Sequence, residues 1–172
     1  AIAQRERSIR TNGNLVIGSQ EMTRSSLKTE FVSFYLDDET YENLHAQRLD
    51  NDIYVLDNSP FYTYDVSNRD EVIAKLVNGR LIFQSVSRRG GHSTYRVKLL
   101  KGKSHEDFLE KFSELEKLGC TYEGTGGNER RLYAIDLPPK VNVADVYSIL
   151  ESEEEAGNWE FEEAHFFKGY DA

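Results

Sequence analysis

The second half of the chain carries the feature that most constrains the fold, an ordered alternation of strand and helix patterns. SHEDFLEKFSELEKLG (104–119) and VADVYSILESEEEAG (143–157) have the apolar spacing of amphipathic helices. Runs typical of strands flank and separate these helices: STYRVKLL (93–100), CTYEG (120–124), RRLYAIDL (130–137) and WEFEEAHFF (159–167). The order strand, helix, strand, strand, helix, strand predicts a ferredoxin-like βαββαβ sandwich, in which two helices cover one face of an antiparallel sheet.

The helices also carry signals at their ends. Ser104 is a candidate N-cap with Asp107 at the capping-box position, and Gly119 suits a left-handed stop. The expected buried face of the first helix consists of Phe108, Leu109, Phe112, Leu115 and Leu118. That of the second helix consists of Val143, Val146, Tyr147 and Leu150.

The first half reads as strands without long helices. FVSFYL (31–36) and DIYVLD (52–57) are aromatic and β-branched runs, and DDETYENLHAQRL (37–49) predicts a turn or a one-turn helix leading into another strand. Asn78-Gly79 separates two further runs and is a strong hairpin signal, because both turn positions favour positive φ. We expect a small antiparallel sheet or a partial barrel, and hence an α+β protein.

These patterns divide the chain into three parts. We expect a flexible N-terminal arm at 1–29, an antiparallel β subdomain at 30–91 and a ferredoxin-like subdomain at 92–172. Gly90 and Gly91 fall at the junction, where adjacent glycines permit backbone conformations that other residues resist.

Composition narrows the class of protein. The 172 residues include 30 acidic and 21 basic side chains, a formal net charge of −9, which argues against a general nucleic-acid binder. No window holds the roughly 20 apolar residues that a membrane helix needs. The single cysteine, Cys120, cannot form an internal disulfide. We therefore expect a cytoplasmic protein with no membrane association.

The segment RRGGHSTYRV (88–97) has two interpretations. As a bend, it joins the two halves through its glycines. As a binding site, it offers glycine amides and polar side chains to an anion such as a phosphate, from Arg88, Arg89, His92, Ser93, Thr94 and Arg96. A strand rather than a helix follows the glycines, so the segment is not a Walker loop.

Two other groups of residues are candidates for contact with a partner. Phe61, Tyr62 and Tyr64 lie in the loop LDNSPFYTYDVSNRDEV (56–72), where they are either core lids or a stacking platform. Glu153, Glu154 and Glu155 belong to an acidic C-terminal stretch. They are either solvated or form a surface that steers a basic partner toward the protein.

Catalytic and metal sites have weaker support. His45, His92, His105 and His165 are scattered, and Cys120 has no neighbouring ligand at zinc spacing. One His-x-Thr motif cannot supply the paired acid and base of a two-motif phosphoesterase. We therefore assign no catalytic residue and expect no metal or cofactor.

Several strings of this chain resemble a known family. LDNSPFYTYDVSNRDEV, GGHSTYRV, LEKLGCTYEG and YAIDLPP are similar to the bacterial domain-of-unknown-function family 4265, in the same order over about Phe31 to Phe167. The resemblance implies a bacterial protein and carries over no catalytic residues. Small acidic bacterial proteins often serve as immunity proteins or other stoichiometric binders, which is an argument by analogy.

The leading functional hypothesis is therefore a non-enzymatic binding protein, an immunity-type inhibitor that occludes the basic site of a toxin. The alternative is a nucleotide- or RNA-binding protein that uses Arg88 to Arg96, and an enzyme ranks third. Both leading hypotheses leave the oligomeric state open.

Overall fold

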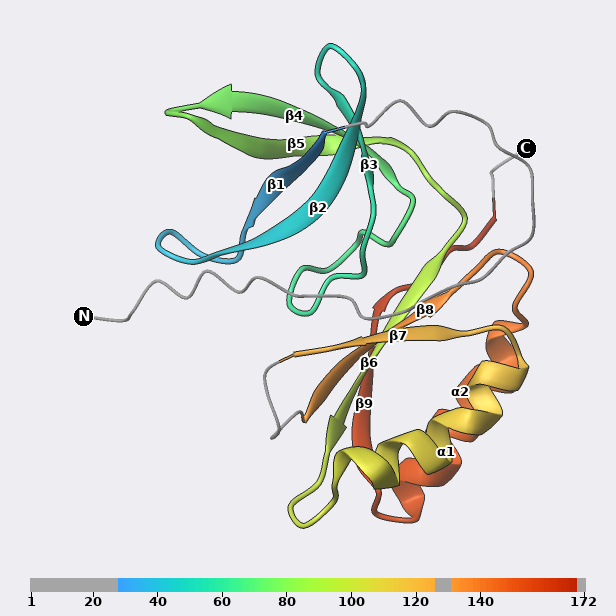
Figure 1. Cartoon of the computed structure of the whole chain (residues 1–172). Helices are drawn as coiled ribbons and strands as arrows, with labels where there is room; N and C mark the ends of the chain where they lie inside the picture. The colour runs from blue at the N-terminus through green and yellow to red at the C-terminus, as the bar shows by residue number, and fades with distance from the viewer. Residues whose placement is uncertain (1–27, 126–130, 170–172) are drawn as a thin grey trace.

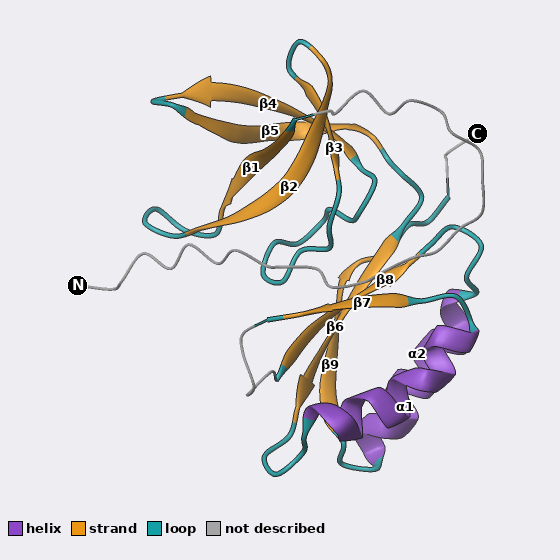
Figure 2. Ribbon diagram, viewed as in Figure 1, coloured by secondary structure: helices purple, strands orange, loops and turns teal. Residues whose placement is uncertain are grey.

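The structure, a computed structural model, describes residues 28–125 and 131–169. It consists of two β-rich units, with both helices in the second (Figures 1 and 2). The proposed N-terminal arm lies outside the described residues, except for Lys28 and for Thr29, which begins the first strand. The protein is α+β, as the sequence predicts.

The first unit is a closed barrel of five strands in the order β1-β2-β3-β4-β5. The strands are β1 (Thr29–Tyr35), β2 (Tyr41–Asp50), β3 (Ile53–Leu56), β4 (Glu71–Val77) and β5 (Arg80–Arg88). The barrel interior is apolar and contains Val32, Phe34, Leu44, Ala46, Tyr54, Leu56, Val66, Val72 and Ala74. Val66 reaches this core from the connection between β3 and β4, so the connection is packed against the barrel.

The barrel closes through a contact that the antiparallel prediction omitted. β1 pairs with β5 in parallel, with Val32 opposite Leu81 and Ser33 opposite Ile82, whereas the other barrel pairs are antiparallel. At the tip of the β4–β5 hairpin, Asn78 and Gly79 have φ of 49° and 79°, as the hairpin signal requires. Residues 37–40 form a turn, not a helix, before β2 begins.

The second unit is a four-stranded sheet in the order β7-β8-β6-β9. Its strands are β6 (Ser93–Leu99), β7 (Thr121–Gly124), β8 (Leu132–Leu137) and β9 (Trp159–His165), and its pairs are antiparallel. The helices α1 (His105–Lys117) and α2 (Val143–Glu155) cover one face of this sheet (Figure 2). The predicted element order in this half is confirmed. No helix among the described residues is long and apolar enough to span a membrane.

The helix ends and faces follow the sequence with two exceptions. Ser104 and Asp107 form the expected capping box at the start of α1. Phe108, Phe112 and Leu115 are buried, but Leu109 is 40% exposed. Val146 and Leu150 of α2 are buried, but Tyr147 is 43% exposed. The predicted apolar faces were therefore too wide, because each helix buries a narrower stripe against the sheet.

The glycine junction requires glycine at each position for a different reason. Gly91 has φ of 85°, which side chains with a Cβ rarely adopt. A Cβ on Gly90 would lie 2.4 Å from the backbone carbon and oxygen of Arg69. The bend between β5 and β6 therefore combines one left-handed residue with one close backbone contact.

Candidate binding surface

The connection between β3 and β4, residues 57–70, lies between the barrel and the sheet and makes most of the hydrogen bonds that join them. Its aromatic stretch is held by one carboxylate, Glu42 of β2. Glu42 accepts hydrogen bonds from the amides of Phe61 (2.6 Å), Tyr62 (3.1 Å) and Thr63 (2.8 Å), and from Thr63 Oγ1 (2.8 Å). A loop with this many fixed amides has a defined shape before any partner arrives.

The two arginines at the junction form ion pairs within the chain. Arg89 donates to the Asp70 carboxylate over 2.8 Å and to the Asp65 carbonyl over 2.7 Å. Asp70, which is fully buried, also accepts from the amide of Gly90 over 2.8 Å. Arg88 pairs with Glu71. The predicted anion donors Arg88, Arg89 and the Gly90 amide therefore hold carboxylates of the chain itself.

The following residues are engaged in the same way. His92 Nδ1 lies 2.9 Å from Asp136 Oδ1, and Ser93 Oγ accepts a hydrogen bond from the amide of Phe167 over 3.0 Å. Thr94 Oγ1 lies 2.7 Å from Ser67 Oγ. These three side chains of the predicted site thus link β6, and the residue before it, to neighbouring segments.

Ser67 and His165 have the composition of a nucleophile and its base. Ser67 Oγ lies 2.9 Å from His165 Nδ1, and burial lowers the pKa of His165. Ser67 is fully buried, however, and its hydroxyl also contacts Thr94. A nucleophile must reach its substrate, so this pair is suited to joining the connection to the sheet rather than to catalysis.

Arg96, the last arginine of the segment, joins Tyr64 of the aromatic group to Glu162 of β9. Its side chain is 2% exposed, its Nε lies 3.0 Å from Glu162 Oε1, and its guanidinium lies over the ring of Tyr64 at 4.3 Å from the centroid. Tyr64 Oη donates to Glu162 Oε2 over 2.8 Å. A buried cation therefore holds an exposed aromatic ring beside an exposed carboxylate.

The three predicted aromatics separate into core and surface. Phe61 is 4% exposed, whereas Tyr62 is 42% and Tyr64 is 54% exposed. Phe61 is therefore packed inside the protein, whereas the two tyrosines lie at the surface, and the stacking platform stays a prediction.

The predicted acidic residues lie at the end of α2, next to β9. Glu153 accepts a hydrogen bond from the Asn158 side chain, and Glu154 Oε1 accepts one from the amide of Phe161 over 3.1 Å. Glu155 is exposed. Two of the three acids therefore also fasten the turn between α2 and β9, which the sequence did not indicate.

We define the β9 rim as the exposed residues that follow the outer strand of the described sheet: Tyr64, Glu154, Glu160, Glu162 and Glu163. Two backbone groups of β9 are already bonded, the Phe161 amide to Glu154 and the Ala164 carbonyl to the amide of Asp65. These bonds protect part of the strand from pairing with another chain. Recognition at the rim would therefore rely on side chains.

Glu123 is a partly buried carboxylate that contacts the connection. Glu123 of β7 accepts a hydrogen bond from the Ser59 amide over 2.9 Å, and burial raises its pKa to about 7. Asp136 and Asp57 lie close enough to add to this rise.

Burial also raises the pKa of Cys120, to about 12, which makes its thiol a poor nucleophile at neutral pH.

The described residues contain no group of three or more His, Cys, Asp or Glu side chains that could hold a metal ion. Glu42 and His45 have the Glu-x-x-His spacing of ligands in helical di-metal sites, but both lie on the strand β2. Glu42 binds the loop amides, whereas the His45 ring packs on Phe31 at 4.6 Å. They therefore serve different contacts.

Sequence reasoning missed the roles of Glu162, Glu163, Tyr147 and Phe166. Glu162 pairs with Arg96, while the other three line a pocket next to β9. The alternation of WEFEEAHFF contains a signal for the two acids, since a strand places successive side chains on opposite faces. The two acids keep this alternation, because β9 pairs with β6 in register from Glu160 to Glu163. The register shifts only beyond them, between Thr94 and Tyr95, and no sequence pattern marked that shift.

A family model described as "Domain of unknown function (DUF4265)" matches residues 42–161. The chain belongs to this family. The matched range covers β3 to α2 completely and most of β2, and so includes the connection and the glycine junction. The family resemblance expected from the sequence strings is confirmed.

The fold is shared with a solved structure described as "Novel crystal structure of a hypothetical protein from Neisseria gonorrhoeae". The two chains are 20% identical with a TM-score of 0.66, over 80% of this chain and 95% of that chain. At this identity the likeness shows the fold alone. A search of curated proteins found no match.

Proposed function

We propose that this protein is a non-enzymatic binding protein, an immunity-type inhibitor that occludes the basic site of a bacterial toxin with its β9 rim. The observation that carries the proposal is the contact of Tyr64 with Glu162, which places an exposed ring among exposed carboxylates. Tyrosine supplies large contact area at low entropic cost, and acidic side chains select a basic partner.

The charge of the rim agrees with a basic partner. Glu154, Glu160, Glu162 and Glu163 contribute four carboxylates. Among the described residues, the cations paired with them on β6 are Lys98, opposite Glu160 in register, and Arg96, which is 2% exposed. Because the whole chain carries −9, the potential that a distant partner meets is negative.

The rim is also fixed in shape. Glu42 accepts hydrogen bonds from the amides of Phe61, Tyr62 and Thr63, and the guanidinium of Arg96 packs on the ring of Tyr64. A surface that is ordered before binding loses less conformational entropy on association. This supports a stoichiometric inhibitor that works by occlusion.

The alternative, nucleotide or RNA binding through Arg88 to Arg96, has less support. Arg89, His92 and Arg96 each contact an acidic side chain of the chain. An anionic ligand would have to displace those carboxylates. An enzymatic role ranks third, because Ser67 of the Ser67–His165 pair is fully buried.

Two finer assignments belong to the same proposal. We assign the second unit to the ferredoxin-like class, supported by the order β7-β8-β6-β9 and by two helices on one face. We also place the protein in the bacterial cytoplasm, where a lone buried thiol such as Cys120 stays reduced.

The proposal is tested by association kinetics against the toxin-domain product of an adjacent gene. Reversing Glu153, Glu154 and Glu155 together would also remove two structural hydrogen bonds. Glu155→Lys reverses a charge directly after the rim residue Glu154 and keeps both of these hydrogen bonds. Glu116→Lys is its matched control, since both are exposed glutamates in the last turn of a helix.

We expect Glu155→Lys to lower the association rate at low salt by about threefold or more, while Glu116→Lys changes it little. The difference should shrink at physiological salt, where the Debye length is about 8 Å. Dissociation should change less. Equal association rates for the two variants, or no binding to any such product, would overturn the proposal.

A further inference from the structure

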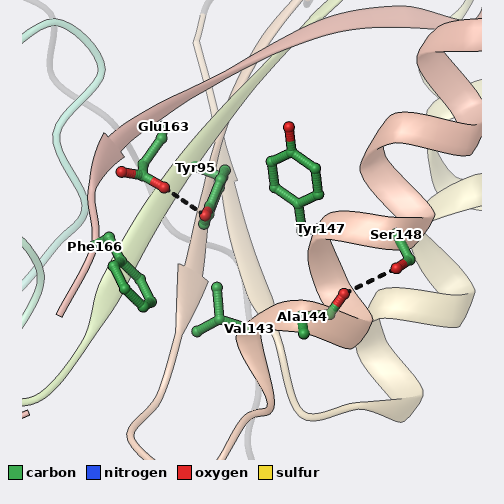
Figure 3. A pocket seen from close by; sticks show the side chains of 7 residues that line it. All are labelled: Tyr95, Val143, Ala144, Tyr147, Ser148, Glu163 and Phe166. Atoms are coloured by element: carbon green, nitrogen blue, oxygen red, sulfur yellow. Dashed lines mark hydrogen bonds between the residues drawn. The ribbon is translucent and has the colours of Figure 1, made fainter. Parts of the chain in front are cut away.

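Next to the rim, the helix-facing side of β9 and the first half of α2 enclose a pocket of about 410 Å³ that is open to solvent (Figure 3). Tyr95, Tyr147 and Phe166 supply aromatic rings, Val143 an aliphatic wall and Glu163 a carboxylate. Tyr147 and Phe166 lie on either side of Tyr95 in this view. The exposed position of Tyr147, which the sequence placed in the core, is thus explained by a hollow beside it.

Glu163 gives the pocket its charge. Tyr95 Oη donates to Glu163 Oε2 over 2.7 Å, and burial is the main cause that raises the pKa of this tyrosine. Tyr95 is 2% exposed, so it anchors the carboxylate without filling the pocket. Among the described residues no Lys, Arg or His forms an ion pair with Glu163. No described basic side chain therefore pairs with this carboxylate at the wall of an aromatic hollow.

The rings strengthen the preference for a cation. Tyr147 packs edge-on to Phe161 at 5.4 Å and to Tyr95 at 6.5 Å, so its position is supported by neighbours. Aromatic faces attract cations through their quadrupole, and a nearby carboxylate adds to that attraction. An aliphatic wall such as Val143 suits the methylene stem of a long charged side chain.

The start of α2 does not reverse this preference. A helix N-terminus attracts anions through its unpaired amides. Here the Ala144 amide already donates to the Asn142 side chain over 3.0 Å, and Asp145 lies in the first turn. An anionic ligand would also meet Glu163.

We propose that this pocket accepts one lysine or arginine side chain, with its alkyl stem on Val143 and its cationic head at Glu163 between Tyr147 and Phe166. The inference rests on the proposed function, because it names the anchor residue that a basic partner would insert beside the β9 rim. Such a buried anchor is the usual origin of binding energy at an interface.

The test is an NMR titration of the full chain with three probes. Two are cationic, N-acetyl-lysine amide and N-acetyl-arginine amide, and the third is the neutral analogue N-acetyl-norleucine amide. We expect saturable shifts at Tyr147, Glu163 and Phe166 with a dissociation constant on the order of 1 mM for at least one cationic probe. The norleucine probe should bind about tenfold more weakly or not at all, because it keeps the stem and lacks the charge.

Variants locate the binding. Glu163→Gln keeps an acceptor for Tyr95 and should weaken binding of the cationic probe about tenfold, whereas Glu160→Gln removes the same charge from the other face of β9 and should leave it unchanged. Tyr147→Ala should weaken binding, and Tyr147→Phe should restore it because the ring remains.

Equal binding of the neutral and cationic probes, or equal effects of Glu163→Gln and Glu160→Gln, would overturn the pocket assignment. The absence of saturable shifts would also overturn it. The proposed function would survive these outcomes if Glu155→Lys still slowed association with the toxin-domain product, so the two failures are distinguishable.

Discussion

Tyr64 and Glu162 are 98 residues apart in the chain, and the tyrosine hydroxyl donates to the carboxylate over 2.8 Å. The side chain of Arg96, from a third segment, lies against both. This contact fastens the connection of the barrel to the outer strand of the sheet. It also sets the composition of the β9 rim, because it places Tyr64 beside the acidic strand.

The Arg96 contact leads to a prediction about stability. Glu162→Gln should lower the free energy of unfolding by about 1–2 kcal/mol, because it leaves the buried guanidinium of Arg96 without its carboxylate. This loss lies between those expected for breaking a surface ion pair and a buried one. Glu160→Gln, on the same strand, should change it by less than about 0.5 kcal/mol. Urea unfolding of both variants measures the difference. Identical midpoints would mean that Arg96 is held by Tyr64 and Thr63 alone.

Gly90 should tolerate no side chain. Gly90→Ala would place a Cβ 2.4 Å from the Arg69 backbone and force two chain segments apart, at a cost of about 3 kcal/mol. Gly102→Ala is the control, since Gly102 has φ of 88° but open space around its Cβ, and should cost about 1 kcal/mol. Thermal melts decide. Similar losses would show that the Arg69 backbone moves away easily.

Two neighbouring carboxylates should differ in their effect on folding. Asp70 is fully buried and receives hydrogen bonds from Arg89 and the amides of Ser67 and Gly90, so Asp70→Asn should cost about 3 kcal/mol or more. Glu71 pairs with Arg88, whose side chain is 72% exposed, and Glu71→Gln should cost less than about 1 kcal/mol. Denaturant midpoints of the two variants test this order, and a reversed order would contradict it.

Glu123 should make stability depend on pH. Its folded pKa, raised from 4.5 to about 7, lies above its unfolded value, so the folded state binds the proton more tightly. The stability from this group is fully present below pH 4.5 and is lost as pH rises through about 7. We expect Glu123→Gln, which keeps an acceptor for the Ser59 amide, to remove this loss.

The measurement compares urea midpoints of the parent and Glu123→Gln at pH 5 and pH 8. Burial lowers the pKa of His165, which works in the opposite direction, but this contribution is common to both proteins. The difference between the two proteins therefore isolates Glu123. A difference that stays constant with pH would contradict the prediction.

The sequence by itself determined what depends on neighbouring residues along the chain. The capping box of Ser104 and Asp107 and the positive φ of Asn78 and Gly79 involve residues at most a few positions apart, so their patterns were readable. The order of strands and helices followed from local periodicity in the same way. The family strings were also visible, and the family match bears them out.

Only the tertiary structure decided which side chains meet. Phe61 is buried and Tyr64 exposed, although both belong to one aromatic run. Between them the loop is fixed by Glu42 of β2, which accepts hydrogen bonds from its backbone amides. Arg89 and Arg96 of the glycine segment pair with carboxylates from other segments, and burial raises the pKa of Glu123 because the connection packs on the sheet. These properties depend on desolvation and on contacts between distant segments, and no local pattern encodes either.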